Sequence, residues 1–399
     1  MGYLIVLGAG PDQVPVFVEA RKMGIKTIAV DYNPDSEAFC YCDEKIIASV
    51  KDRQETILAL KAYGKEYIGV MTLGVEISPV VSAVAKEFGL VSISEETAYL
   101  THHKCARNQA LAQKAIPIPK FQTISKPTDV CLPFPFVIKP SDNSASRGVQ
   151  IVLDENTFSE AYEIAKRYSS DGKVLVEEQL SGPEISIEGF MINDKMHVTG
   201  FADRNYSRNP DFFPFFVEDG GDYPTVLPEH IVSEAKNVFE KAALALGICN
   251  GPSKGDLIVT PQGVKVIEIT SRLSGGGFCS RIVPLQNGVN IVAATIRWAC
   301  GQMVCEEELA PKFNKCISHR FYFHEKGRIK AITGMDRIKG LPGIAHVVVQ
   351  RDFKIGEYLQ PVSYVNRLFY VVATGDDRHS AIRHAQEAIE SVKIITEID

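Results

Sequence analysis

The sequence predicts an α/β N-terminal domain, an α+β middle domain and a small α+β C-terminal domain. Near the start, short apolar strand patterns alternate with helix patterns, which is typical of a parallel sheet flanked by helices. After Pro117 and Pro119, strand patterns follow one another across turns, which favours antiparallel pairing. At 399 residues the chain is long enough for two or three hydrophobic cores. We expect domains at residues 1–114, 115–314 and 315–399, the middle one with lobes at about 115–174 and 175–314.

The N-terminal pattern is Rossmann-like. An apolar strand pattern at Tyr3–Leu7 ends in the turn Gly8-Ala9-Gly10, and a helix pattern begins at Val14. Open parallel sheets bind ligands at the carboxyl ends of their strands, so we expect this domain to form one wall of a cleft. The further elements are strands at Thr27–Val30 and Tyr67–Met71 and a helix at Gln54–Tyr63, and the residues at strand ends are Gly8, Asp31, Thr72 and Glu76.

The same turn raises a dinucleotide-binding alternative, because a strand, Gly-x-Gly and a helix form half of that fingerprint. The third glycine of the fingerprint is missing. Gln13 stands where a small residue is needed for close packing of helix on strand. We therefore do not expect NAD to bind here.

The remaining elements are mostly strands, with a final alanine-rich helix. In the middle domain we expect strands at Phe136–Lys139, Gly148–Leu153, Lys173–Glu178, Glu184–Ile192, Lys195–Ala202, Asp256–Val259 and Val264–Thr270. In the C-terminal domain we expect strands at Arg320–Phe323, Ile344–Val349 and Arg367–Thr374 and a helix at Ser380–Ser391.

Composition excludes several classes of protein. The net charge of −6 is spread without long like-charge blocks, so we expect no nucleic-acid partner. No apolar run approaches the roughly 18 residues that span a bilayer, so we expect no membrane role. The nine cysteines are irregularly spaced and no secretory signal pattern precedes the first strand, which favours the reducing cytoplasm. Neither the Cys40/Cys42 pair nor the adjacent His102 and His103 has the further ligands that a metal site requires.

The first chemical motif is a buried-type strand that ends at Lys139 and is followed by the small, hydroxyl-rich segment Ser141–Gly148. Backbone amides of such a loop can surround phosphate oxygens while the lysine supplies a positive charge. The loop has little apolar surface to anchor it, so we expect a mobile lid. The alternative, a solvated hairpin loop, stays open on this motif alone.

The second motif is a pair of carboxylates on a predicted hairpin. If the turn is centred on Gln262, Asp256 and Glu268 are equidistant from it and lie opposite each other, and Lys254 faces Thr270. Opposed carboxylates repel unless a cation lies between them, and their hard oxygen ligands suit magnesium. The alternative is a solvated hairpin face whose charges never meet.

Between these motifs, a strand pattern at Val174–Glu178 breaks at Gly182-Pro183 and is followed by Glu184. Backbone groups freed at such a break can pair with the edge of an adenine, and a carboxylate can accept hydrogen bonds from sugar hydroxyls. Taken singly, this is also an ordinary strand, turn and strand.

Taken in order, these pieces resemble the ATP-grasp superfamily of carboxylate-amine ligases, with flanking domains similar to those of its biotin-carboxylase-like branch. The resemblance covers nearly the whole chain and implies ATP and Mg²⁺ as cofactors, with Mn²⁺ as a substitute. It implies ATP-binding roles for Lys104, Lys139, Ser144, Ser146, Gly148, Glu177, Glu178, Leu180 and Glu184, metal-binding roles for Asp256 and Glu268, and catalytic roles for Arg272 and Lys139. Thr270 departs from the family pattern, which commonly places an asparagine there as a third metal ligand.

Two further regions are candidate substrate contacts. A glycine run past the last strand of the motif lets a substrate approach the backbone closely. The candidates there are Arg272, Ser274, Gly275, Gly276 and Arg281. The polar stretch that contains Arg204, Arg208 and Glu218 either overhangs the acceptor pocket or is a surface loop.

The resemblance implies an enzyme that phosphorylates a carboxylate with Mg-ATP and couples the acyl phosphate to an amine, releasing ADP and phosphate. The alternative is a purine-pathway-like or biotin-carboxylase-like enzyme that activates formate or bicarbonate. Both have small-molecule partners, and both are compatible with a homodimer. The sequence names neither substrate.

Overall fold

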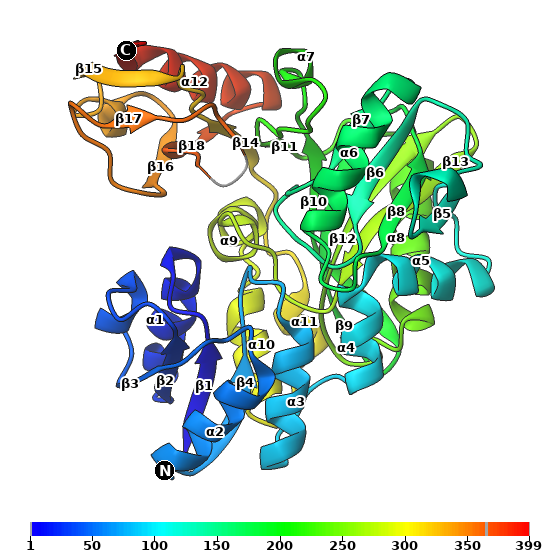
Figure 1. Ribbon diagram of the computed structural model, residues 1–399. Helices are drawn as coiled ribbons and strands as arrows, with labels where there is room; N and C mark the ends of the chain where they lie inside the picture. The colour runs from blue at the N-terminus through cyan, green and yellow to red at the C-terminus, as the bar shows by residue number, and fades with distance from the viewer. Residues whose placement is uncertain (1, 364–365, 399) are drawn as a thin grey trace.

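The computed structural model describes residues 2–363 and 366–398, and Figure 1 shows three groups of elements arranged around α9. The N-terminal group is a parallel four-stranded sheet in the order β3-β2-β1-β4, as predicted. Its strands are β1 (Tyr3–Leu7), β2 (Lys26–Asp31), β3 (Glu44–Ile47) and β4 (Tyr67–Met71), and its helices are α1 (Val14–Lys22), α2 (Arg53–Tyr63) and α3 (Ser78–Phe88).

The glycine turn after β1 is filled by a side chain of its own domain. Gln13 is buried beneath the turn, and its amide donates to the carbonyl of Leu73. A Cβ atom on Gly8 or Gly10 would lie 3.3 Å from the Gln13 side chain, and Gly8 has a φ of +100°. The Gly8-Ala9-Gly10 turn therefore leaves room for the Gln13 side chain, which packs the turn against the end of β4.

A four-stranded antiparallel sheet, in the order β5-β8-β6-β7, carries the first chemical motif. One face packs on α6 through an aromatic and aliphatic core that includes Phe136, Phe158 and Tyr162. The elements are β5 (Phe121–Ile124), β6 (Phe136–Pro140), β7 (Gln150–Val152), α6 (Glu155–Arg167) and β8 (Val174–Glu178). The strand expected from Gly148 begins at Gln150 instead, because Gly148 has a φ of +72° and ends the preceding loop.

The second large sheet has eight strands in the order β13-β12-β9-β10-β11-β14-β18-β16. It is continuous across residue 314, because β11 pairs with β14. The C-terminal strands thus extend the sheet of the middle region, and the division into domains at this point stays a prediction. The strands are β9 (Glu184–Ile192), β10 (Lys195–Arg204), β11 (Gly221–Tyr223), β12 (Gly251–Thr260), β13 (Gly263–Thr270), β14 (Cys316–Phe321), β16 (Ile344–Val349) and β18 (Phe369–Gly375).

Helices join these sheets into one body. α8 covers β13 and β12, and α10 packs against α1 and β4, which ties the middle region to the N-terminal sheet. α12 covers β18 and β14 beside a small sheet in the order β17-β15-β19. The remaining bounds are α4 (Glu95–His102), α5 (Lys104–Gln113), α7 (Asn209–Phe212), α8 (Glu229–Ala245), α9 (Val283–Asn287), α10 (Ile291–Ala299), α11 (Glu306–Leu309), β15 (Gly327–Thr333), β17 (Tyr358–Leu359), α12 (Arg378–Ser391) and β19 (Lys393–Glu397). Within the described ranges, no helix combines the length and the apolar character needed to cross a bilayer.

Candidate active site

A cavity of about 460 Å³ is lined by residues from the N-terminal turn, both antiparallel sheets and the C-terminal strands. Nearly all sequence-predicted site residues line it, and they come from six helices and strands and from the loops that join them. They are Lys104, Lys139, Ser144, Ser146, Glu177, Glu178, Leu180, Glu184, Asp256, Glu268, Arg272, Ser274, Gly275 and Gly276. Gly148 and Arg281 are not among the lining residues, and the Arg281 guanidinium lies 3.5 Å from the Tyr370 hydroxyl instead.

Lys139, at the end of β6, is buried and forms an ion pair with Glu177 of the neighbouring strand β8. Val137 is the residue directly opposite Glu177, so the pair is diagonal across the two strands. The other carboxylate oxygen of Glu177 accepts a hydrogen bond from the Asn108 amide at 2.6 Å. Glu177 and Lys139, which were both predicted to bind ATP, therefore contact each other.

The phosphate-side loop, residues 141–148, is held next to the start of α5. The Lys104 backbone amide donates to the Ser141 carbonyl at 2.6 Å, and its ammonium donates to the Asn143 carbonyl. Within the loop, Arg147 donates to the Asn143 side chain at 2.9 Å. Ala145 and Ser146 have left-handed φ values of +56° and +54°. Burial lowers the pKa of Lys104, and the neighbouring Glu268 and Glu76 carboxylates oppose this shift.

The two predicted metal ligands, Asp256 of β12 and Glu268 of β13, are direct cross-strand partners, and Lys254 faces Thr270 as expected. The geometry behind this result differs from the prediction. The pair Thr260 and Gly263 closes a two-residue turn, so the turn is not centred on Gln262. A bulge at Ile267 adds one residue and restores the opposition of the two carboxylates.

Cations surround this pair. Glu268 lies 3.5 Å from Arg107 and 3.8 Å from Lys104, while Asp256 lies 3.1 Å from Arg204 and also pairs with Lys254. Burial alone would raise the pKa of Glu268, but Lys104 and Arg107 hold it well below its usual range. Burial opposes the ionisation of Asp256 in the same way, and Arg204 and Lys254 lower its pKa overall. Both groups are therefore carboxylates at neutral pH.

The donor set fits a nucleotide-bound magnesium ion. Among the described residues, no three or more His, Cys, Asp or Glu side chains form a cluster that could hold a metal alone. Magnesium usually takes one or two carboxylates and completes its shell with phosphate oxygens and water. Thr270 adds a buried hydroxyl for which the described residues provide no hydrogen-bond partner, two residues beyond Glu268 on the same face of β13.

The segment that was predicted to pair with the edge of the adenine lies at the end of β8. Glu178 accepts hydrogen bonds from the Lys120 amide at 2.9 Å and from the Lys265 ammonium at 2.7 Å, so its carboxylate links β8 to β13 and to the residue that precedes β5. Glu184, at the start of β9, faces the cavity 3.9 Å from Arg204. Burial raises the pKa of Glu184.

The substrate-side loop, residues 272–277, is held by three carboxylates from other elements. Arg272 donates to Glu76 at 3.0 Å, and the Gly276 amide donates to Asp12 at 3.2 Å. Glu188 of β9 is 0% exposed and accepts hydrogen bonds from both the amide and the hydroxyl of Ser274. A Cβ atom on Gly275 would lie 2.8 Å from the Asp12 carboxylate, so only glycine allows this approach.

Sequence reasoning missed several lining residues. Arg107 is 1% exposed and lies one helical turn after Lys104, a spacing that could have indicated a shared face. For the C-terminal lining residues no local signal exists, because a strand pattern does not reveal which sheet it joins. Among the missed residues are Asp12, Arg107, Ser186, Lys254, His319, Phe321, Gln350 and Arg367. The polar stretch was predicted either to overhang the acceptor pocket or to be a surface loop. Arg204 and Glu218 line the cavity, and Arg208 does not.

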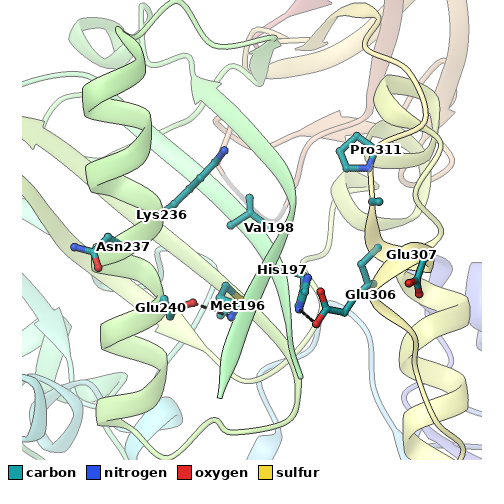
Figure 2. Close-up of a pocket in the computed structure, with 11 residues that line it drawn as sticks. Met196, His197, Val198, Lys236, Asn237, Glu240, Glu306, Glu307 and Pro311 are labelled. Carbon is teal, nitrogen blue, oxygen red and sulfur yellow. Dashed lines mark hydrogen bonds and ion pairs between the residues drawn. The ribbon is translucent and has the colours of Figure 1, made fainter. Parts of the chain in front are cut away.

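Figure 2 shows a second hollow, about 650 Å³, between β10, α8 and the segment that contains α11. Some of its polar groups contact one another: Glu240 accepts from the Met196 amide at 2.9 Å, and His197 lies 3.8 Å from Glu306. The sequence-predicted site residues all lie outside its lining.

Comparisons with known proteins agree with this geometry. A family model for the ATP-grasp domain matches residues 132–281, and one for the L-amino acid ligase C-terminal domain 2 matches residues 319–397. The 3-methyl-D-ornithine–L-lysine ligase of Methanosarcina acetivorans is 26% identical over 316 residues, covering 78% of this chain and 77% of that protein. The formate-dependent phosphoribosylglycinamide formyltransferase of Wolinella succinogenes is 20% identical over 401 residues, covering 98% of this chain and 96% of that protein. The crystal structure of L-amino acid ligase from Bacillus licheniformis superposes with a TM-score of 0.85 at 20% identity, covering 100% of this chain and 99% of that chain.

The family match places residues 132–281 in the ATP-grasp superfamily, and the fold of the whole chain agrees with that placement. Within that superfamily this chain is an ATP-dependent ligase that joins a carboxylate to an amine through a carbon–nitrogen bond. The predicted family, fold class and class of enzyme are thereby confirmed.

Proposed function

We propose that this ligase couples two amino acids, activating the carboxylate of one and joining it to the amine of the other. The observation that carries the proposal is the mixed charge at the substrate end of the cavity. Glu76 pairs with Arg272, Asp12 accepts a hydrogen bond from the Gly276 amide, and Glu218 pairs with Arg204. Such a lining suits substrates that bear both an ammonium and a carboxylate group. The match of the C-terminal strands to an L-amino acid ligase domain supports it.

We further propose that Asp256 and Glu268 hold Mg²⁺, with the Thr270 hydroxyl next to the site, and that Mn²⁺ substitutes. The bound ion supplies neutralisation of the charge on the ATP phosphates. Lys104 and Lys139 bind those phosphates from the other side, and the phosphate-side loop covers them with Ser144 and Ser146. The adenine lies along Glu177–Leu180 and the ribose hydroxyls donate to Glu184.

In the reaction, an oxygen of the donor carboxylate attacks the γ-phosphorus of ATP and the bond to ADP breaks. Arg272, fixed by Glu76, contacts the resulting acyl phosphate. The amine nitrogen then attacks the acyl carbon, phosphate leaves with the carboxylate oxygen, and the nitrogen loses a proton. Positioning and charge neutralisation provide the rate acceleration, so no nucleophilic side chain is required.

A panel of amino-acid pairs with Mg-ATP tests the proposal, with ADP, phosphate and dipeptide measured together. We expect one ADP and one phosphate for each dipeptide formed. When the donor carboxylate carries heavy oxygen, one labelled atom appears in the released phosphate. AMP and pyrophosphate, or unlabelled phosphate during dipeptide formation, would contradict the mechanism.

A second candidate function is the activation of formate or bicarbonate for transfer to a purine ribonucleotide amine. The specific observation in its favour is the relative from Wolinella succinogenes, which aligns with 98% of this chain. Formate or bicarbonate with a purine ribonucleotide, assayed beside the amino-acid panel, decides between the two. Phosphate release that requires the ribonucleotide would replace the amino-acid proposal.

A further inference from the structure

The C-terminal strands contribute a wall of the cavity that the reaction chemistry leaves unused. This C-terminal wall consists of His319, Phe321, Gln350 and Arg367. His319 and Phe321 project from one face of β14, opposite Val372 and Tyr370 of β18. Gln350 directly follows β16. Its backbone N–H donates to the Leu368 carbonyl at 2.8 Å, so Gln350 lies at the same end of the sheet as His319 and Phe321.

Two polar atoms of this wall are buried without a partner among the described residues. They are Nε2 of His319, a residue that is 7% exposed, and Oε1 of Gln350. Buried polar atoms are nearly always hydrogen-bonded, because an unsatisfied one costs about 1–3 kcal/mol. Since both residues line the cavity, a ligand in the cavity can supply the missing partners.

The wall is also rigid. The His319 ring lies 4.6 Å from Phe321 and 4.9 Å from Tyr370, both edge-on. The Arg367 guanidinium stacks 3.7 Å over Phe321 and donates to the Glu218 carbonyl. The His319 ring is therefore preorganised, and a ligand gains its hydrogen bond without ordering the ring first.

The charge around the wall favours a neutral ligand group. Burial lowers the pKa of His319 to about 4, so its ring is neutral and offers one donor and one acceptor. Burial alone would raise the pKa of Glu218, but Arg204 keeps it low, so a negative charge faces the positive charge of Arg367. A ligand carboxylate would be repelled by Glu218 and a ligand ammonium by Arg367. A carboxamide or a hydroxyl donates to Gln350 and hydrogen-bonds His319 with no net charge.

We propose that His319, Phe321 and Gln350 form a side-chain subsite that selects an amino-acid substrate carrying a carboxamide or a hydroxyl group. The proposal rests on the amino-acid ligation proposed above and specifies its substrate class. Sites built to hydrogen-bond a substrate reject apolar analogues strongly, because their buried polar groups are then left unpaired.

Equilibrium binding of the twenty amino acids tests the subsite in the presence of Mg²⁺ and a non-hydrolysable ATP analogue. We expect carboxamide or hydroxyl amino acids to bind best, with glutamine or asparagine roughly 10- to 100-fold tighter than methionine or leucine. Gln350→Met should reduce that ratio about tenfold. His319→Phe, which keeps the ring and removes its nitrogens, should do the same. Gln302→Met makes the same change at an exposed position and should leave the ratio unchanged.

Tightest binding of an apolar or charged amino acid, binding of none, or an unchanged ratio in both wall variants would overturn the subsite. Turnover is measured separately. Absence of dipeptide from every pair would defeat the proposed function, while the binding ratios would still judge the subsite.

Discussion

The two loops that border the cavity are built in opposite ways. The tip of the phosphate-side loop, residues 144–148, is held by contacts within the loop, such as that of Arg147 with Asn143, and two of its residues are in the left-handed region. The first residues of the loop, 141–143, are hydrogen-bonded to Lys104 and to residues 168–171, which lie 25 to 39 positions away along the chain. The substrate-side loop is held by Glu76, Asp12 and Glu188, which are separated from it by 86 to 264 positions along the chain. Local contacts permit a loop to open while the rest of the fold stays intact, whereas distant anchors couple a loop to the whole molecule. From this comparison we expect the tip of the phosphate-side loop to move and the substrate-side loop to stay fixed.

The largest expected effect comes from removing a charge beside either loop. Lys139→Ala next to the phosphate-side loop and Glu268→Gln next to the substrate-side loop should each lower kcat roughly a thousandfold. Each removes a group that neutralises or anchors the developing charge on phosphate. Steady-state ADP release measures the loss, and circular dichroism shows whether the fold is retained. Near-normal turnover in either folded variant would remove that residue from the site.

Next in size is a pH effect at the anchor of the substrate-side loop. Burial raises the pKa of Glu188 from 4.5 to about 7, despite its hydrogen bonds from Ser274. Between these values the folded protein keeps a proton that the unfolded chain has lost, so this group's contribution to stability falls as pH rises. Glu188→Gln removes that dependence. Its free energy of unfolding, relative to the natural protein, should therefore increase by about 3 kcal/mol between pH 4 and pH 8.

Denaturant unfolding at a series of pH values measures this difference. Glu307→Gln makes the same change at a residue exposed on the surface and serves as the control. A constant difference across the pH range would show that Glu188 does not titrate in this window.

The chemistry near the strand patterns was predictable from sequence, and the long-range anchors were not. Asp256 and Glu268 were placed opposite each other by assuming a turn centred on Gln262. The observed two-residue turn would by itself have paired Asp256 with Ile267, and the bulge at Ile267, which no sequence pattern shows, restores the predicted opposition. Lys139 and the loop were found because they are adjacent in the sequence, whereas Lys104 was named only through the family resemblance. Asp12 was missed as a loop anchor because nothing near it in sequence reports a contact with Gly276.

The C-terminal wall illustrates the same limit. The strand at Ile344–Val349 was predicted with its observed bounds, but its membership of the eight-stranded sheet depends on pairing with β18 and so on the tertiary fold. His319 enters the cavity only because β14 pairs with β11. A sequence pattern predicts the type of element and which side chains share a face. Which strands pair with one another depends on packing over the whole chain.

Limited proteolysis sharpens the contrast in mobility. With ATP and Mg²⁺, cleavage within residues 141–148 should slow several-fold, because bound phosphates hold the loop closed. Residues 272–277 should resist cleavage with or without nucleotide. Mass spectrometry of the fragments locates each cut. Equal cleavage of the two loops, or no protection at saturating nucleotide, would contradict the difference between them.

The smallest expected effect compares one backbone position in each loop. Ala145 has a φ of +56° and Gly276 a φ of +64°, and a Cβ on Gly276 would meet no atom within 4 Å. A side chain in the left-handed region costs about 1–2 kcal/mol, while glycine adds entropy to the unfolded chain worth roughly 0.5–1 kcal/mol. Ala145→Gly should therefore raise the free energy of unfolding by up to about 1 kcal/mol, and Gly276→Ala should lower it by a similar amount. Denaturant unfolding of both variants, at one pH and without nucleotide, measures the two changes. The same sign in both would mean that loop contacts, rather than backbone conformation, decide the stability at these positions.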